Sequence, residues 1–389
     1  MRIALYTDSF LPVVDGVGRV VVQYADTLAR RGHEVYVVCP QADTGYRGGL
    51  PYEIVDYVGA ALPPTPQYRT GVALLDANYR NRVRMLDFDI IHAHSPGSTG
   101  LEAVLQARTR SIPLVGTFHS KYYDDVRQVT HSDVLATVGA RYVAEFYRRC
   151  VEVWTVSLNA AETLKTYGYE GPLMIMPNGT DRAEIREADL RAAREAFSLP
   201  DRPILLYVGQ LNFKKNLRTV LAAAALARNA GYDFTLVLAG QGPDRKALEE
   251  LAVSLNLGDR VLFPGHILDA GLLRGLYQAA RLFVFPSLYD TAGLVVQEAA
   301  AMETPSAAVY GSAPSEIIRD GENGFLCENT ADSLAAVMEK ALSDPGLCKK
   351  LGKNARETVP TPWAEVMDRA EARYKELIEE KEEHRDADE

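Results

Sequence analysis

Short apolar runs alternate with longer amphipathic stretches along the whole chain. Most of the runs are continuous rather than alternating, as in parallel strands that are covered on both faces. They predict strands at 2–6, 34–39, 90–93, 114–118, 153–156, 204–208, 235–239, 261–263, 282–285 and 306–309. Helical stretches lie between them, among them 18–31, 217–229 and 244–255. This alternation predicts a doubly wound α/β fold.

The alternation breaks once, between residues 178 and 203. The break opens on Pro177-Asn178-Gly179, a turn signal, and continues through a charged segment at 181–195. The halves on either side begin alike, each with a strand, a glycine-bearing turn and a long helix. We therefore predict two Rossmann-like domains, at residues 1–190 and 200–361. A ligand is expected in a cleft between them, because strand ends and helix N-termini converge there in such folds.

Composition narrows the class of protein without naming an activity. The 389 residues are 47% apolar and 24% charged, as in a globular protein of two domains. A net charge of −10 argues against a nucleic-acid partner. Four scattered cysteines without a C-x-x-C predict a reduced, cytoplasmic protein. The N-terminus lacks a signal-peptide pattern, and no run of about 18 apolar residues predicts a membrane span.

Two loops that follow predicted strands carry residues suited to an anion. In the first, Gly16 and Gly18 stand where a helix begins, so that exposed N–H groups are available to a ligand. Val21 replaces the third glycine of the dinucleotide fingerprint, so the loop is equally typical of a tight turn. In the second, Lys214 and Lys215 stand at a helix entrance, where they either neutralise a phosphate or remain solvated.

The segment 285–301 is the most informative part of the chain. A buried strand ends in a polar loop, and a helix of small residues begins at Gly293 and Leu294. Asp290 lies in the loop and Glu298 about two turns into the helix, so the pair could bind two hydroxyl-bearing parts of one ligand on either side of a phosphate. Asp290 alone is also typical of an acid near a helix start. Glu298 stands among apolar residues, where an unpaired carboxylate would be costly.

The order and spacing of these motifs resemble the retaining glycosyltransferases of the GT-B fold, family 4, over nearly the whole chain. This group includes sucrose synthase-like enzymes and bacterial glycolipid and polysaccharide enzymes. The segments that carry the resemblance are 15–18, 31–35, 91–96, 116–120, 177–181, 208–216, 285–298 and 316–325. The resemblance implies a nucleotide-sugar donor in the cleft between two Rossmann-like domains. It also implies a C-terminal helix, at 362–389, that crosses back to complete the first domain, with Trp363 as a packing anchor.

Carried over residue by residue, the resemblance gives each candidate a role. It implies that Lys215 neutralises the diphosphate, that Gly16 lets the first loop close over it, and that His119 lies near the sugar and the acceptor. Asp290 would contact the sugar and Glu298 the ribose. The amides that would bind the diphosphate are those of Gly293, Leu294 and Val295. The implied chemistry keeps the anomeric configuration and needs no metal or other cofactor.

The chain departs from the family pattern at two of these positions. Asp290 stands where the family usually has glutamate, so the carboxylate is one methylene shorter. Gln210 stands where the family usually has arginine, and a neutral amide cannot form a bidentate cationic contact. Less positive charge then faces the diphosphate, unless Lys214 or Arg19 supplies it.

The acceptor is left open as a sugar, a lipid or a small molecule. The region 57–85 combines arginines with apolar residues, which fits either a basic surface for peripheral contact with the inner face of a membrane or an ordinary solvated helix. Likewise, 121–125 either lines an acceptor pocket or leads into a helix. We expect the rings of His92 and His94 to point to opposite faces of a strand end and so to form no metal pair.

Two other classes of function remain compatible with the same motifs. A GT-B phosphorylase or a sugar-nucleotide epimerase would use the same diphosphate geometry, although phosphorolysis needs a further anion site. A catalytically lapsed protein that only binds a sugar nucleotide would also keep the fold. A UDP-sugar transferase acting in glycolipid, polysaccharide or small-glycoconjugate synthesis is the function that the sequence favours.

Overall fold

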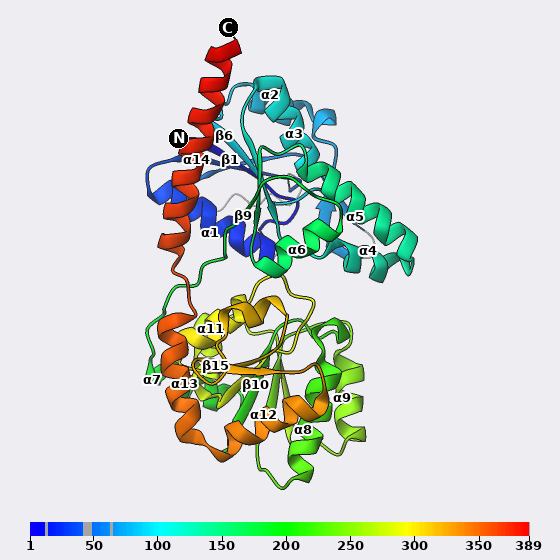
Figure 1. The fold of residues 1–389 in the computed structure, drawn as a ribbon, viewed down its shortest axis with the longest axis vertical. Coiled ribbons are helices and arrows are strands. Elements are labelled where there is room, and N and C mark those ends of the chain that lie inside the picture. The colour runs from blue at the N-terminus through cyan, green and yellow to red at the C-terminus, as the bar shows by residue number, and fades with distance from the viewer. Residues whose placement is uncertain (12–14, 42–48, 63–64, 389) are drawn as a thin grey trace. The chain divides into compact units, whose positions relative to one another are not determined.

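The computed structural model describes residues 1–11, 15–41, 49–62 and 65–388. The chain forms two compact units, the first made of Met1–Asn178 with Trp363–Glu389 and the second of Gly179–Pro362. Each unit is an α/β layer structure with its own sheet (Figure 1). The two-domain α/β organisation predicted from the strand and helix pattern is therefore confirmed.

The sheet of the first unit has seven parallel strands in the order β3-β2-β1-β6-β7-β8-β9. Their bounds are β1 (Arg2–Tyr6), β2 (Glu34–Cys39), β3 (Glu53–Asp56), β6 (Ile90–Ala93), β7 (Leu114–Phe118), β8 (Glu152–Thr155) and β9 (Leu173–Ile175). The order reverses between β1 and β6, which lie side by side. Right-handed crossovers on either side of such a reversal place their helices on opposite faces of the sheet.

The helices of the first unit follow this rule. In Figure 1, α1 (Gly16–Arg30) and α14 (Trp363–Asp388) lie on one side of the sheet, and α3 (Ser98–Arg110) lies on the other. The remaining elements are a β4–β5 hairpin (Ala60–Leu62, Thr65–Thr70), η2 (Ala73–Leu75), α2 (Ala77–Arg84), α4 (Tyr122–Thr130), α5 (Asp133–Tyr147) and α6 (Leu158–Thr166). All residues of β1 after Arg2 and all of β7 are buried, as parallel strands covered on both faces require.

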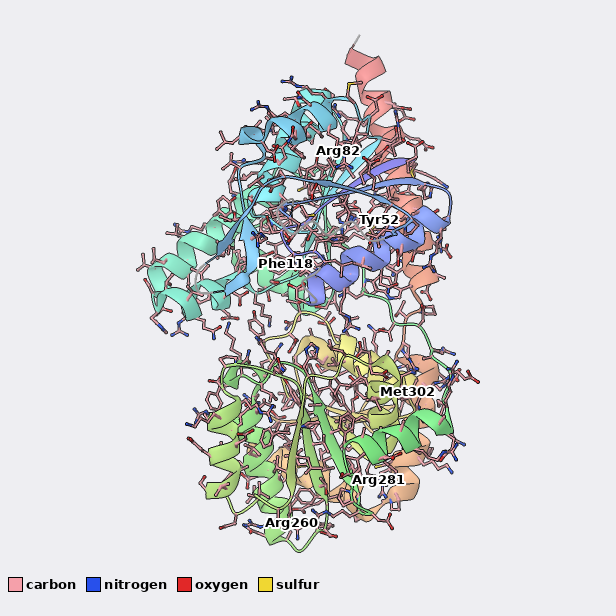
Figure 2. The ribbon with its side chains drawn as sticks, turned by 180° about the vertical axis from the view of Figure 1, so that it is seen from behind. Tyr52, Arg82, Phe118, Arg260, Arg281 and Met302 are labelled. Carbon is pink, nitrogen blue, oxygen red and sulfur yellow. The ribbon has the colours of Figure 1, made fainter. Side chains whose placement is uncertain are left out.

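The second unit repeats this architecture with six parallel strands in the order β12-β11-β10-β13-β14-β15. They are β10 (Ile204–Val208), β11 (Thr235–Ala239), β12 (Val261–Gly265), β13 (Leu282–Val284), β14 (Ser306–Val309) and β15 (Gly324–Cys327). The flanking elements are η3 (Phe213–Lys215), α8 (Leu217–Asn229), α9 (Arg245–Ser254), α10 (Ala270–Ala279), α11 (Leu294–Ala301), η4 (Ala313–Ile317), α12 (Ala331–Ser343) and α13 (Pro345–Thr358). Figure 2 shows side chains of both units, with Phe118 of the first and Met302 of the second both buried.

The units divide after Asn178, earlier than the predicted boundary at 190. The reason is α7 (Glu187–Ala196), which packs on α10 of the second unit. Arg274 Nε lies 2.9 Å from Asp189 Oδ2 across this contact. A Cβ on Gly275 would stand 2.0 Å from the Asp189 carbonyl oxygen, so this approach requires glycine.

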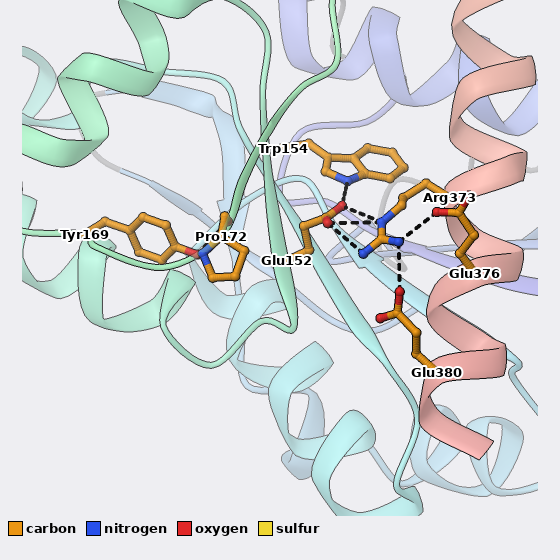
Figure 3. Close-up of polar contacts among 7 residues, drawn as sticks. All are labelled: Glu152, Trp154, Tyr169, Pro172, Arg373, Glu376 and Glu380. Atoms are coloured by element: carbon orange, nitrogen blue, oxygen red, sulfur yellow. Dashed lines mark hydrogen bonds and ion pairs between the residues drawn. The ribbon is translucent and has the colours of Figure 1, made fainter. Parts of the chain in front are cut away.

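The C-terminal helix α14 belongs to the first unit, as the resemblance implied. Arg373 Nε of α14 donates to both carboxylate oxygens of buried Glu152, to Oε2 at 3.0 Å and to Oε1 at 3.2 Å, and Trp154 Nε1 donates to the same carboxylate at 2.7 Å (Figure 3). Tyr374 is fully buried and stacks on Trp154, with ring centroids 5.2 Å apart. Trp363, 8% exposed, meets the edge of the Tyr24 ring. The helix is thus an integral layer of this unit.

The strands that the sequence failed to predict are short or lie at sheet edges. β3 and β15 have four residues each and β9 three, and no residue of β9 is fully buried. β3 (EIVD) holds only two apolar residues, and the apolar runs of β9 (LMI) and β15 (GFLC) are too short to identify a strand by themselves. Among the described residues, no helix is both long and apolar enough to cross a membrane.

We predict that Arg373→Ala lowers the free energy of unfolding of the first unit by about 3 kcal/mol, because it leaves the Glu152 carboxylate buried without its cation. Both tryptophans lie in this unit, so urea unfolding followed by tryptophan fluorescence measures it. Arg369→Ala is the control, since Arg369 lies exposed on the same helix and donates to the Ile175 carbonyl rather than to a buried carboxylate. Equal stability of the two variants would contradict the prediction.

Candidate functional site

Two loops of the second unit meet where its strand order reverses. β10 and β13 are neighbours, and the loops that leave their carboxyl ends, 209–216 and 285–293, therefore start side by side. The Lys215 ammonium lies 2.6 Å from Asp290 Oδ1, and these side chains are only 11% and 22% exposed. Residues 75 positions apart in the sequence are thus joined at the ligand-binding edge typical of this sheet.

The loop after β10 is held by its own polar side chains. Asn212 Oδ1 accepts from the Lys215 amide at 3.2 Å and so caps η3. Asp244 Oδ2 accepts from the Phe213 amide at 2.8 Å. Asn216, in the left-handed region with φ 62°, donates from Nδ2 to the Pro286 carbonyl at 3.1 Å and ties the loop to its neighbour after β13. Lys215 therefore projects from a loop that the fold fixes at several points.

Near this loop, Gln210 is neutral, whereas Lys214 adds a second positive charge beside Lys215. The side chain of Gln210 accepts from Asn212 Nδ2 at 2.7 Å, so it supports the cap of η3. Lys214 Nζ lies 4.6 Å and Lys215 Nζ 4.9 Å from the centroid of the Tyr289 ring. Two ammonium groups therefore lie against one aromatic ring, an arrangement that the ring quadrupole favours. Sequence reasoning missed Tyr289, because its role follows only from this packing.

The helix α11 begins directly after this cluster. Gly293 is its N-cap, and Leu294 and Val295 form its first turn. The first N–H groups of a helix have no acceptor within the helix, and the helix dipole gives this end a partial positive charge. A Cβ on Gly293 would lie 3.1 Å from Ile317 Cδ1 and 3.4 Å from Pro314 Cα. Glycine thus lets this helix end pack tightly on η4.

The two carboxylates of the predicted site have different surroundings. Glu298 is half-buried, and its Oε2 accepts from the Tyr277 hydroxyl at 3.0 Å. The expected cost of an unpaired carboxylate is therefore reduced by a partner from α10 that the sequence did not reveal. Asp290 Oδ2 is buried and, among the described residues, has no hydrogen-bond partner. A buried acceptor of this kind is paired in most proteins, so Asp290 Oδ2 is suited to receive a ligand hydroxyl.

His119, at the end of β7 in the first unit, lies in a cluster of histidines. Its Nε2 lies 3.0 Å from His94 Nδ1. The centroids of the His92 and His94 rings are 4.0 Å apart, which corrects the prediction that these rings point to opposite faces. Alternate residues of a strand share one face, so an H-x-H pattern brings its rings together. No group of three His, Cys, Asp or Glu in the described part of the chain could hold a metal ion.

Burial sets the protonation of these histidines. Desolvation lowers the pKa of His119 to about 3 and holds the pKa values of His92 and His94 well below their usual range. The charges of the neighbouring rings add to the shifts of His92 and His94. All three rings are therefore neutral at neutral pH.

Gly16 is the first residue of α1, and Asp15 caps this helix by accepting from the Gly18 amide at 2.7 Å. A Cβ on Gly16 would meet no atom of the described residues within 4 Å. Packing against this part of the chain therefore does not require glycine at this position. The rest of the first glycine loop, residues 12–14, lies outside the described residues.

Two family models match successive parts of the chain. "Glycosyltransferase Family 4" matches residues 14–184, and "Glycosyl transferases group 1" matches residues 191–358. The chain belongs to the family 4 glycosyltransferases. It is a transferase that uses sugar donors, and its fold is GT-B.

Relatives and solved structures agree with this assignment. The glycosyltransferase is 27% identical over 362 residues to "Alpha-monoglucosyldiacylglycerol synthase" of Streptococcus pneumoniae, covering 89% of this chain and 80% of that protein. Sucrose-phosphate synthase from Thermosynechococcus elongatus superposes with a TM-score of 0.76 at 24% identity, covering 97% of this chain and 98% of that one. Anabaena HepE in complex with UDP superposes with a TM-score of 0.74 at 17% identity, covering 97% of this chain and 100% of that one. The two structures show a shared fold.

We predict that acid destabilises the first unit of the glycosyltransferase through His119. An unfolded histidine binds a proton near pH 6.5, whereas folded His119 stays neutral to about pH 3. The unfolded state therefore binds more protons between these values, and the free energy of unfolding falls as the pH drops through this window. Between pH 7 and pH 5 the parent should lose about 2 kcal/mol more than His119→Asn in urea unfolding. Identical losses would show that His119 is not a buried neutral group.

Proposed function

We propose that the enzyme transfers a sugar from a nucleoside-diphosphate donor, a UDP-sugar, to a hydroxyl acceptor with retention of anomeric configuration. The observation that carries this proposal is the Lys215–Asp290 pair, 2.6 Å apart beside the start of α11. A cation and helix amides that suit a diphosphate adjoin a carboxylate with one oxygen that is unpaired within the described residues and suits a sugar hydroxyl.

Each group of this site has a place in the proposed donor complex. Lys215 and the amides of Gly293, Leu294 and Val295 bind the diphosphate. Asp290 accepts from a sugar hydroxyl. Glu298, oriented by the Tyr277 hydroxyl, accepts from the ribose hydroxyls. Three different interactions then fix the nucleotide, the phosphates and the sugar separately.

Lys214 supplies the second positive charge in this proposal. The family's usual arginine is absent at position 210, and Gln210 is engaged by the Asn212 amide. Lys214 and Lys215 share the Tyr289 ring, which holds both ammonium groups at one end of the loop. Lys214, four residues later in the chain, thus supplies the positive charge that Gln210 lacks.

The proposed chemistry relies on electrostatics rather than a protein nucleophile. Negative charge builds on the leaving diphosphate as the anomeric bond breaks, so fixed donors at the phosphates stabilise the transition state more than the bound substrate. The acceptor attacks from the face that the diphosphate leaves, and a phosphate oxygen takes its proton. We propose that no metal is required, since Lys215, Lys214 and the helix amides provide the positive charge. From the family resemblance, we also propose that His119 contacts the transferred sugar.

UDP as the nucleotide is supported by the fold shared with Anabaena HepE, which was solved with UDP. The name of the Streptococcus relative supports a lipid acceptor among the sugar, lipid and small-molecule hydroxyls that the chemistry allows. For a lipid acceptor, we propose that the enzyme is cytoplasmic and contacts the inner face of the membrane peripherally. The surface around η2 suits such contact, because Val72, Leu74 and Leu75 are 59%, 49% and 81% exposed.

We predict that the enzyme slowly releases UDP from UDP-glucose or UDP-N-acetylglucosamine, and that Lys215→Ala reduces this release by about 10² or more, because the leaving charge loses its main cation. Glu298→Ala should instead weaken donor binding, measured as a smaller rise in melting temperature with donor. Lys246→Ala is the control, since that lysine side chain is 89% exposed on α9. Donor binding without turnover over a wide acceptor panel would instead support a lapsed, binding-only protein.

A chelator should not change the rate of UDP release, because the proposed mechanism requires no metal.

We predict that Gly16→Ala leaves the melting temperature of the free enzyme within about a degree of the parent, because the added methyl meets no atom of the described residues within 4 Å. Transfer should fall by about tenfold or more, since the methyl would stand where the proposed diphosphate approaches the start of α1. Melting temperature and transfer rate are measured on the same samples. An active Gly16→Ala enzyme would exclude this loop from the donor site.

We predict that the enzyme co-sediments with anionic liposomes at low salt, and that Leu74→Ser with Leu75→Ser reduces the bound fraction, because both side chains are exposed. Val253→Ser, at another exposed valine, is the control. Failure to co-sediment at low salt would remove the membrane part of the proposal and leave the transfer reaction untouched.

A further inference from the structure

Lys215 belongs to a loop that lies beside a second loop of the same unit. The first, residues 209–216, follows β10 and is called the lysine loop below; the second, residues 240–244, follows β11 and is called the support loop. β10 and β11 are parallel neighbours. Beyond the strands, the Leu211 amide donates to the Gln241 carbonyl at 2.9 Å, so backbone pairing continues between the two loops.

Two glycines of the support loop allow this close approach. A Cβ on Gly240, where φ is 143°, would overlap the Gly209 carbonyl oxygen. A Cβ on Gly242 would overlap the Leu211 carbonyl oxygen. In both cases the obstacle is backbone of the lysine loop, which cannot rotate away as a side chain can, so the position requires glycine. The Gly-Gln-Gly sequence of the support loop therefore serves its contact with the lysine loop.

Asp244 ends the support loop and makes a further contact. It is the N-cap residue of α9, but among the described residues its side chain accepts no hydrogen bond from the amides of that helix. Aspartate at an N-cap ordinarily accepts from the second or third amide of its own helix. Asp244 Oδ2 instead accepts from the Phe213 amide of the lysine loop at 2.8 Å, and the Asp244 amide donates to the Leu211 carbonyl at 3.1 Å. Its side chain is thus diverted from its own helix to the lysine loop.

This contact acts at the start of the turn that projects the two lysines. Phe213 is the first residue of η3, and Lys214 and Lys215 complete that turn. Lys215 Nζ lies 2.6 Å from Asp290 Oδ1, and both ammonium groups lie against the Tyr289 ring. A shift of the Phe213 amide would therefore move both cations relative to their partners.

We propose that Asp244 is a positioning residue whose carboxylate holds the start of η3, so that Lys215 stands beside Asp290 before a donor binds. A cation that is already in place needs no reorganisation as charge develops on a leaving group. The effect on sugar transfer rests on the function proposed above. The hold on the lysine loop rests only on contacts within the second unit and is independent of that function.

The first test is amide hydrogen exchange of the full-length protein without substrate, measured by mass spectrometry of peptides that cover residues 209–216. Asp244→Ala removes the acceptor of the Phe213 amide, so these peptides should exchange faster by about tenfold or more. Asp244→Asn keeps an oxygen that accepts, and its exchange should stay near that of the parent. Equal exchange in Asp244→Ala and the parent would overturn the proposal whatever the enzyme's activity.

Asp344→Ala is the matched control. Asp344 is the N-cap of α13 in the same unit, and its Oδ1 accepts from the Leu347 amide at 2.8 Å, the same length as the contact of Asp244. This variant should lower the melting temperature, because it removes a true helix cap, and should leave the exchange of residues 209–216 unchanged. Faster exchange of that segment in Asp344→Ala as well would show a general loss of stability and contradict the proposal.

The second test asks whether Asp244 acts through Lys215. Asp244→Ala should lower kcat for UDP release from UDP-glucose by about tenfold, and Asp244→Asn should recover most of the rate. In the Lys215→Ala background, Asp244→Ala should cost about twofold or less, because the residue that it positions is gone. Losses that multiply would show that Asp244 acts independently of Lys215, against the proposal.

The Lys215→Ala variant separates the two levels of inference. If it releases UDP at the parent rate, the proposed role of Lys215 in transfer is wrong, and hydrogen exchange still decides whether Asp244 holds the lysine loop. If Lys215→Ala is slow while Asp244→Ala keeps the parent rate, the proposed function stands and the positioning role of Asp244 is wrong.

Discussion

The parallel arrangement of the strands is the constraint on which both candidate sites depend. Every strand of a parallel sheet ends at the same edge, so the loops that follow can meet there wherever strand order reverses. The order reverses between β1 and β6 in the first unit and between β10 and β13 in the second. Lys215 and Asp290 are brought to 2.6 Å by the second reversal. His94 and His119 likewise meet because β6 and β7 are neighbours.

The two units place opposite electrostatics on the same architecture. The second gathers two lysines, a helix N-terminus and two carboxylates, all of which interact strongly with a charged or hydroxyl-bearing ligand. The first buries three histidines so deeply that desolvation keeps them neutral. A phosphate-leaving reaction needs fixed positive charge at the leaving group and only hydrogen bonds at the sugar. The proposed mechanism therefore needs charged groups at the phosphates and only neutral hydrogen-bonding groups at the sugar.

The Lys215–Asp290 pair explains how a short carboxylate can serve where the family usually has a longer one. Asp290 already uses one oxygen to compensate the buried ammonium, and its other oxygen has no partner in the part of the chain that the structure describes. Removing either partner would leave an uncompensated charge in a largely buried place, which is costly. A diphosphate that approached Lys215 would take over part of this compensation. The pair therefore keeps the cation in position before the proposed donor arrives.

The sequence by itself determined the class of fold, the central strands and the family. It did so because buried parallel strands are continuous apolar runs, and because motif order along a chain is directly readable. It also identified Lys215 and Asp290 as candidates through their places near a helix start, Glu298 through its apolar surroundings in a helix, and His119 through the family resemblance. These features depend on neighbours within a few residues along the chain.

Only the tertiary structure decided the partners of those residues. Tyr277 meets Glu298 from another helix, and Tyr289 receives both lysines through packing that no spacing reveals. The sequence reading placed His92 and His94 on opposite faces, which was wrong, and ended the first domain at 190 within a break at 178–203, whereas the first unit ends at Asn178. The rings share one strand face, and α7 packs on α10 of the second unit. Contacts between distant segments depend on strand order and side-chain direction, which a pattern of apolar and polar positions does not specify.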